Sequence, residues 1–207
     1  MKSIFLLLTC FFFLTTCFSQ ETIERKNKLT DSVTERFFVL KSDKETKHGL
    51  YLAFFRRKTL IARGAYTKGK KTGGWNFYST NGQPAERYNY DTNTLSFEAP
   101  YDPEGDVGFL FDDKIKPTDV ATRPLKIGGS YYGYIPYVKL FRLPFDSFGV
   151  NTDVFEANIE LLISPLGRLA EYKVHLVSQM YQYDHTITID FHLLNEEDQV
   201  FIPATLN

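Results

Sequence analysis

Beyond residue 19 the sequence contains no cysteine, because its two cysteines are Cys10 and Cys17. Residues 20–207 therefore form no disulfide among themselves. They also offer no thiolate for catalysis, for a cysteine-ligated zinc or for an iron–sulfur cluster. Their stability has to come from the burial of apolar surface.

The usual signatures of enzyme active sites are also missing. We find no Gly-x-Ser-x-Gly, no His-Glu-x-x-His, no phosphate-binding P-loop and no Gly-x-Gly-x-x-Gly. Asp184, His185 and His192 make a weak metal-binding pattern, and residues 102–106 only partly match a calcium loop. We interpret these as surface residues. We therefore expect no catalytic residues, no cofactor and no metal.

The composition is that of a globular protein. Of the 207 residues, 43% are hydrophobic and 16% are aromatic, with 13 Tyr and 19 Phe, and the net charge is −1. These values exclude a disordered polyanion, a collagen and a protein with many membrane spans.

The long hydrophobic run is confined to the start of the chain, where residues 4–18 carry no charge and follow Lys2. As a helix they would span about 22 Å, which is short for a hydrocarbon core of roughly 30 Å. This layout is typical of a signal peptide. It predicts cleavage between Ser19 and Gln20 and a periplasmic or outer-membrane-associated protein. The competing interpretation is a lipoprotein signal in which Cys17 carries the lipid.

Charge divides the rest of the chain into two halves. Residues 20–98 contain 15 basic and 9 acidic residues, whereas residues 99–207 contain 8 basic and 16 acidic ones. Such asymmetry indicates two modules. No acid lies between Glu45 and Glu86. The basic residues of this window are candidates for binding anionic lipid or glycan, or else lie on a solvated strand face: Arg56, Arg57, Lys58, Arg63, Lys68, Lys70 and Lys71. Because we expect export, we do not expect a nucleic acid partner.

The basic half contains an internal repeat of 24 residues. Aligning residues 47–70 with residues 71–94 places Lys47 on Lys71, Gly49 on Gly73, Tyr51 on Trp75 and Tyr66 on Tyr90. Each unit has an aromatic strand, a turn and a second strand. Short units of this kind stack to share one core.

The repeat resembles the MORN-type repeat of the YwqK-like proteins over about 50 residues. The matching residues are His48, Gly49, Tyr51, Gly64, Tyr66, Gly69, Lys70, Gly73, Trp75, Phe77, Tyr78 and Gly82. The resemblance implies an antiparallel array of β-hairpins. We interpret these motif residues as structural.

The acidic half follows an irregular, proline-containing connection at 98–126, in which residues 108–111 are a candidate short strand. Residues 131–141 fit a short helix with Pro136 in its first turn. Residues 155–163 and 169–177 alternate apolar and polar and predict a β-hairpin. Residues 184–195 fit either a strand or a helix begun by Asp184, although their Thr and Ile residues favour a strand. Residues 200–203 predict a final short strand.

This order of elements resembles the C-terminal domain of TonB-type energy transducers, as found in exported proteins of the Bacteroidetes. The matching residues are Gly128, Gly129, Pro144, Gly167, Asp184, Phe201, Pro203, Ala204 and Asn207. The resemblance implies that 184–195 is a helix.

The sequence thus predicts an α+β, mostly β protein. Its expected parts are a signal peptide at 1–19, a MORN-like β-hairpin array at 20–97, a linker at 98–126 and a TonB-C-like domain at 127–207. The leading hypothesis for its function is non-catalytic binding of a protein partner in the envelope by strand addition. The alternatives are binding of anionic lipid or glycan by the basic residues, and a component of a TonB-like transducer.

The leading segment makes one testable prediction. Intact-mass analysis of the exported protein should give a chain that begins at Gln20, recovered from soluble periplasm or medium. A lipid-modified mass beginning at Cys17, found with membranes, would favour the lipoprotein interpretation. A full-length mass in the inner membrane would contradict the signal-peptide prediction.

Overall fold

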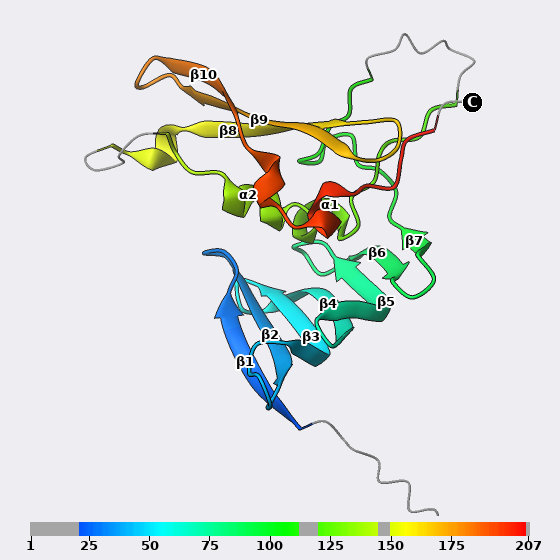
Figure 1. Ribbon diagram of the computed structural model, residues 1–207. Coiled ribbons are helices and arrows are strands. Elements are labelled where there is room, and N and C mark those ends of the chain that lie inside the picture. The colour runs from blue at the N-terminus through cyan, green and yellow to red at the C-terminus, as the bar shows by residue number, and fades with distance from the viewer. Residues whose placement is uncertain (1–20, 112–119, 145–149, 206–207) are drawn as a thin grey trace, which may run out of the picture.

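A computed structural model describes residues 21–111, 120–144 and 150–205. The predicted signal peptide, its cleavage site and Cys17 lie outside the described residues. The chain begins with an antiparallel sheet of seven strands, each paired with the next in sequence (Figure 1). The strands are β1 Thr22–Lys28, β2 Val33–Leu40, β3 Lys47–Phe55, β4 Thr59–Thr67, β5 Lys70–Tyr78, β6 Pro84–Asn89 and β7 Thr94–Glu98.

The second half forms a smaller antiparallel sheet in the order β10-β9-β8. Its strands are β8 Glu156–Ile163, β9 Leu169–Ser178 and β10 Tyr183–Thr188. The helices are α1 Gly129–Tyr132 and α2 Ile135–Leu140, with single 3₁₀ turns η1 Thr152–Val154, η2 Phe191–Leu193 and η3 Glu196–Gln199. Figure 1 shows α1 and α2 between the two sheets.

The 24-residue repeat corresponds to the central strands of the large sheet. Gly49 and its equivalent Gly73 both have positive φ, 97° and 63°, which a residue with a side chain rarely adopts. Arg56 and Arg57 are the central residues of the β-turn between β3 and β4, in which the Lys58 N–H donates to the Phe55 carbonyl at 3.0 Å, and both have positive φ, 46° and 62°. The sheet extends beyond the two predicted units, because β1, β2 and β7 add further strands.

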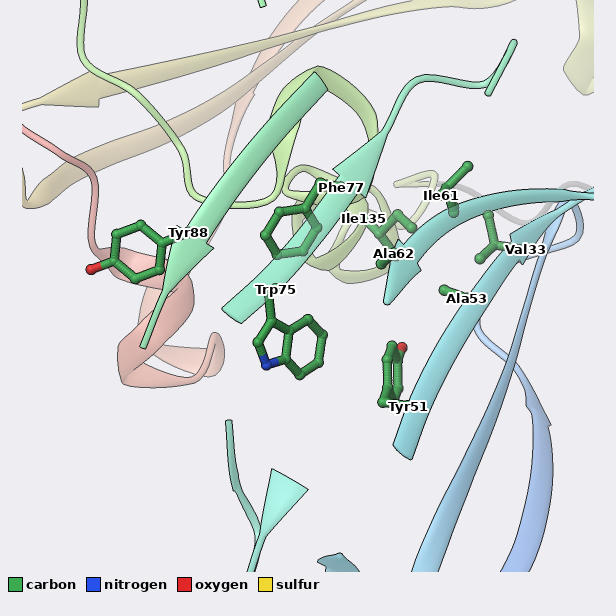
Figure 2. Packing of buried hydrophobic residues seen from close by; sticks show 9 residues of the cluster. All are labelled: Val33, Tyr51, Ala53, Ile61, Ala62, Trp75, Phe77, Tyr88 and Ile135. Atoms are coloured by element: carbon green, nitrogen blue, oxygen red, sulfur yellow. The ribbon is translucent and has the colours of Figure 1, made fainter. Parts of the chain in front are cut away.

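One face of the large sheet, the inner face, carries an aromatic core. Trp75, Phe77 and Tyr51 are almost fully buried there together with smaller apolar residues. Figure 2 shows these side chains together with Ile135, which comes from helix α2. The aromatic residues that alternate along the strands thus form the packed face, as a half-buried sheet requires.

Helix α2 contributes to both cores of the molecule. Ile135 belongs to the core of the large sheet, whereas Tyr137 packs with Leu169, Tyr172 and Val174 of the small sheet. Residues two positions apart lie on nearly opposite sides of a helix. The helix expected over 131–141 is observed as the two short helices α1 and α2, and Pro136 lies in the first turn of α2. The helix therefore joins the two layers.

The mostly β fold class is confirmed, and so is the hairpin of β8 and β9. The helix implied for 184–195 is wrong: these residues continue β10, which pairs with β9, and then form η2. Asp184 begins no helix. It lies in β10, and its carboxylate is 2.8 Å from the Nε2 atom of His175 on β9. Residues 108–111 form no strand, and the predicted final strand is reduced to bridges at Val200 and Ile202.

The packing of Gly64 makes a prediction. A Cβ atom added at Gly64 would overlap the indole ring of the fully buried Trp75. We expect Gly64→Ala to lower the free energy of unfolding by about 1–3 kcal/mol, the usual cost of overpacking a core. Chemical denaturation measures this change.

Gly74→Ala is the matched control, because no atom lies within 4 Å of a Cβ at Gly74. We expect it to be neutral or to stabilise by roughly 0.4–1 kcal/mol, since alanine restricts the unfolded chain. Equal effects of the two substitutions would contradict the close contact with Trp75.

Candidate functional site

The inner face of the large sheet presents a row of aromatic rings in tilted and edge-to-face contact. Ring centroids lie 5.3 Å apart for Tyr51 and Trp75, 5.3 Å for Tyr66 and Trp75, and 5.7 Å for Trp75 and Tyr90. Tyr132 of α1 joins the row through a hydrogen bond of 2.9 Å between its hydroxyl and that of Tyr51. Burial raises the pKa of both phenols. They therefore stay protonated and serve as packed hydrogen-bonding groups.

Two lysines that are equivalent in the repeat lie over equivalent pairs of rings. The Lys47 ammonium is 4.9 Å from the centroid of Tyr51 and 5.4 Å from that of Tyr66. The Lys71 ammonium is 5.5 Å from Trp75 and 5.3 Å from Tyr90. Cations are attracted to ring faces at such distances. The two repeat units therefore make the same cation–π contacts at equivalent positions.

These lysines border a cavity of about 340 Å³ between the large sheet and the segments that carry α2, η2 and η3. A cavity of this size falls at the lower end of the range for small-molecule sites. Its charged lining residues are Glu35, Lys47, Lys71, Lys139, Glu197 and Asp198. Lys47 pairs with Glu35 at 3.0 Å, and Lys71 pairs with Glu197 at 3.1 Å. A charged ligand would have to displace these ion pairs.

Two buried charged residues lie where the halves of the chain meet. The Glu86 carboxylate accepts hydrogen bonds from the backbone N–H groups of Gly128 and Gly129, at 3.2 and 3.0 Å. Desolvation raises its pKa to about 7, although the two donors oppose the shift. The Lys126 ammonium donates to three backbone carbonyls of residues 197–200, and burial lowers its pKa to about 8.

The basic residues predicted to bind an anionic surface do not gather on one face. Arg56, Arg57 and Lys58 lie at the turn before β4, whereas Lys68 and Lys70 lie at the turn after it. These turns are roughly 30 Å apart, because β4 has nine residues at about 3.3 Å each. Lys71 contacts Trp75 and Tyr90 on the inner face, and of these predicted residues Arg63 is the one in the middle of the outer face.

The repeat-motif residues have structural roles. The Nδ1 atom of His48 accepts a hydrogen bond from the backbone N–H of Lys68 at 3.3 Å, which holds the turn between β4 and β5. Gly69 and Gly82 have positive φ, and Gly64 makes room for Trp75.

Asp184, His185 and His192 are exposed. The described residues contain no group of three or more His, Cys, Asp or Glu side chains that could hold a metal ion. The Asp102 carboxylate accepts from the N–H of Glu104 at 3.0 Å and so belongs to a local turn. Within the part of the chain that is described, no helix combines the length and the apolar character needed to cross a membrane.

The sequence did not indicate Arg36 and Arg87 as candidate binding residues. The strand register places them in one cross-strand row with Arg63 on the outer face, through the pairs Arg36↔Leu52, Leu52↔Arg63, Arg63↔Asn76 and Asn76↔Arg87. One signal was available, because Arg63 and Arg87 are separated by one repeat of 24 residues.

The two sheets end in four edge strands, β1, β7, β8 and β10, each with one strand neighbour among the described residues. Edge strands present unpaired backbone groups to which another chain can pair. Comparison with known proteins gives no match to a family model, to a curated protein or to a solved structure.

The raised pKa of Glu86 makes a prediction about stability. The folded chain binds this proton more tightly than the unfolded chain, whose carboxyl has a pKa of 4.5. The unfolding free energy therefore falls as pH rises from 4.5 to about 7, by up to about 3 kcal/mol from this group. Urea unfolding between about pH 5 and about pH 8 should show this loss.

Glu86→Gln is the control, because the amide oxygen can still accept a hydrogen bond but does not titrate. We expect a flatter pH dependence for this variant in the same range. Parallel curves for the variant and the original chain would contradict the raised pKa of Glu86.

Proposed function

We propose that the protein is an exported, non-catalytic binding protein of the cell envelope, and that strand β8 pairs with an extended segment of a protein partner. The observation that carries the proposal is the free edge of β8. This strand has eight residues, EANIELLI, and β9 is its one hydrogen-bonded neighbour among the described strands. In strand addition, main-chain hydrogen bonds supply affinity and side-chain positions supply specificity.

The other edges are less suited to pairing. Four of the seven residues of β1 are charged, Glu24, Arg25, Lys26 and Lys28, and charged side chains on an edge discourage pairing. Strand β7 has only five residues and a register shift against β6. Strand β10 has six residues. Strand β8 is therefore the longest edge that lacks a dense cluster of charges.

The two faces of β8 indicate the chemistry of the partner. Ile159 and Leu161 lie on the face that packs on the core of the small sheet. Glu156 and Glu160 lie on the opposite, exposed face. A partner strand that alternates apolar and basic residues would extend the core on one face and place cations beside these carboxylates on the other. The resemblance to TonB C-terminal domains led to the same hypothesis and stays a prediction.

A peptide experiment tests the proposal with the chain beginning at Gln20. An end-blocked eight-residue peptide of alternating Val and Lys should bind, and hydrogen exchange should show new protection of the β8 amides. A control peptide of the same length with alternating Val and Glu should bind at least roughly fivefold more weakly, because like charges across a strand pair repel. No binding, or protection confined to another edge, would overturn the proposal.

Two substitutions of one type provide the variant and its control. Glu160→Lys on β8 should reverse the preference between the two peptides. Asp184→Lys makes the same charge change on the exposed β10 and should leave the preference unchanged. An equal effect of both would mean that net charge, rather than pairing at β8, determines binding.

A further inference from the structure

The outer face of the large sheet carries an unbroken row of paired residues that crosses all seven strands. In strand order the row is Lys26, Arg36, Leu52, Arg63, Asn76, Arg87 and Phe97. Four of the seven positions are basic, and all four basic side chains are exposed. Neighbouring strands lie about 4.8 Å apart, so successive arginines from Arg36 to Arg87 are separated by roughly 10 Å.

Charge on this face is strongly one-sided. The seven strands contain four acidic residues, and Glu35, Glu86 and Glu98 lie on the inner face by register. The fourth is Glu24, at the β1 edge, which pairs with Arg36 at 2.6 Å. Away from that edge the outer face of the strands has no carboxylate.

The three arginines differ in how far they are engaged. The side chain of Arg63 makes no hydrogen bond or ion pair with any described residue. Arg87 donates its Nε–H to the side-chain oxygen of Asn76 at 3.0 Å, which orients its guanidinium and leaves the terminal nitrogens available. A guanidinium presents a planar pair of donors that matches a carboxylate or a sulfate.

We propose that this row, which we call the arginine row, binds an acidic polysaccharide that runs across the strands. The shape of the surface favours a linear polymer. Adjacent strands in a sheet are rotated by about 20–25°, so the four steps from Arg36 to Arg87 turn the face through roughly 80–100°. A flexible chain can follow such a row, whereas a flat bilayer meets only part of it.

The residues between the arginines favour sugars over nucleic acid. Leu52 offers an apolar surface to a sugar ring, and Asn76 offers an amide to hydroxyl groups. Nucleic acid single strands are held by aromatic side chains on which bases stack. Within the arginine row the one aromatic residue is Phe97, at its β7 end.

Binding of polygalacturonate and of dextran sulfate, with uncharged dextran as the neutral control, tests the proposal in the chain beginning at Gln20. We expect the acidic polymers to bind in a salt-sensitive manner and dextran not to bind. The double variant R63A/R87A should weaken binding roughly tenfold or more, because it removes two charge-assisted contacts. Tighter binding of oligo-dT or of phosphatidylglycerol vesicles than of either polysaccharide would overturn the proposal in favour of those partners.

R56A/R57A is the matched control, since it removes the same charge from the turn before β4, away from the row. It should change affinity less than about twofold if position rather than net charge decides binding. R63K/R87K keeps the charge but loses the planar fork, and it should bind with intermediate affinity. Equal losses for the row and turn variants, or no binding of acidic polymer by the original chain, would reject the arginine row as the site.

Discussion

Two buried charged side chains fix the junction between the halves of the chain. A buried charge is costly unless hydrogen bonds replace its lost water. Glu86 meets part of this requirement with the N–H groups of Gly128 and Gly129, and Lys126 meets part of it with three carbonyls of residues 197–200. The segment that enters α1 and the segment that leaves η3 are therefore held at one place. The position of α2 between the two cores follows from this anchoring.

The backbone at this junction requires glycine for stereochemical reasons. Gly128 has φ of 124°, and a Cβ there would lie 2.6 Å from the Cα of Gly133. Gly129 also has positive φ, 70°. Gly128 precedes α1 and Gly129 is its first residue, so the pair begins the helix. Its second role, as the donor pair for Glu86, was beyond prediction because Glu86 is 42 residues earlier in the chain and its partners are backbone groups.

Periodicity predicted the parts of the fold that local pattern determines. The 24-residue repeat, the hairpin of β8 and β9 and the helix containing Pro136 all follow from spacing and turn residues. For residues 184–195, β propensity was the better guide, because β9 offers an edge to which Thr186 and Ile187 pair. The arginine row depends on the register of several strands. Because the register shifts between β3 and β4 and between β4 and β5, the alternation pattern of a single strand cannot predict which residues line up across the sheet.

Although the net charge of the chain is −1, its basic and acidic residues are concentrated in different parts of the molecule. The arginine row lies on the outer face of the large sheet, and the helices α1 and α2 cover the opposite face. The acidic half, with β8 and its exposed Glu156 and Glu160, lies beyond those helices. An extended anion would attract the large sheet and repel the small one, so the field of the protein orients it on approach. Such orientation leaves β8 directed away from the polymer, and the two proposed surfaces can be occupied at the same time.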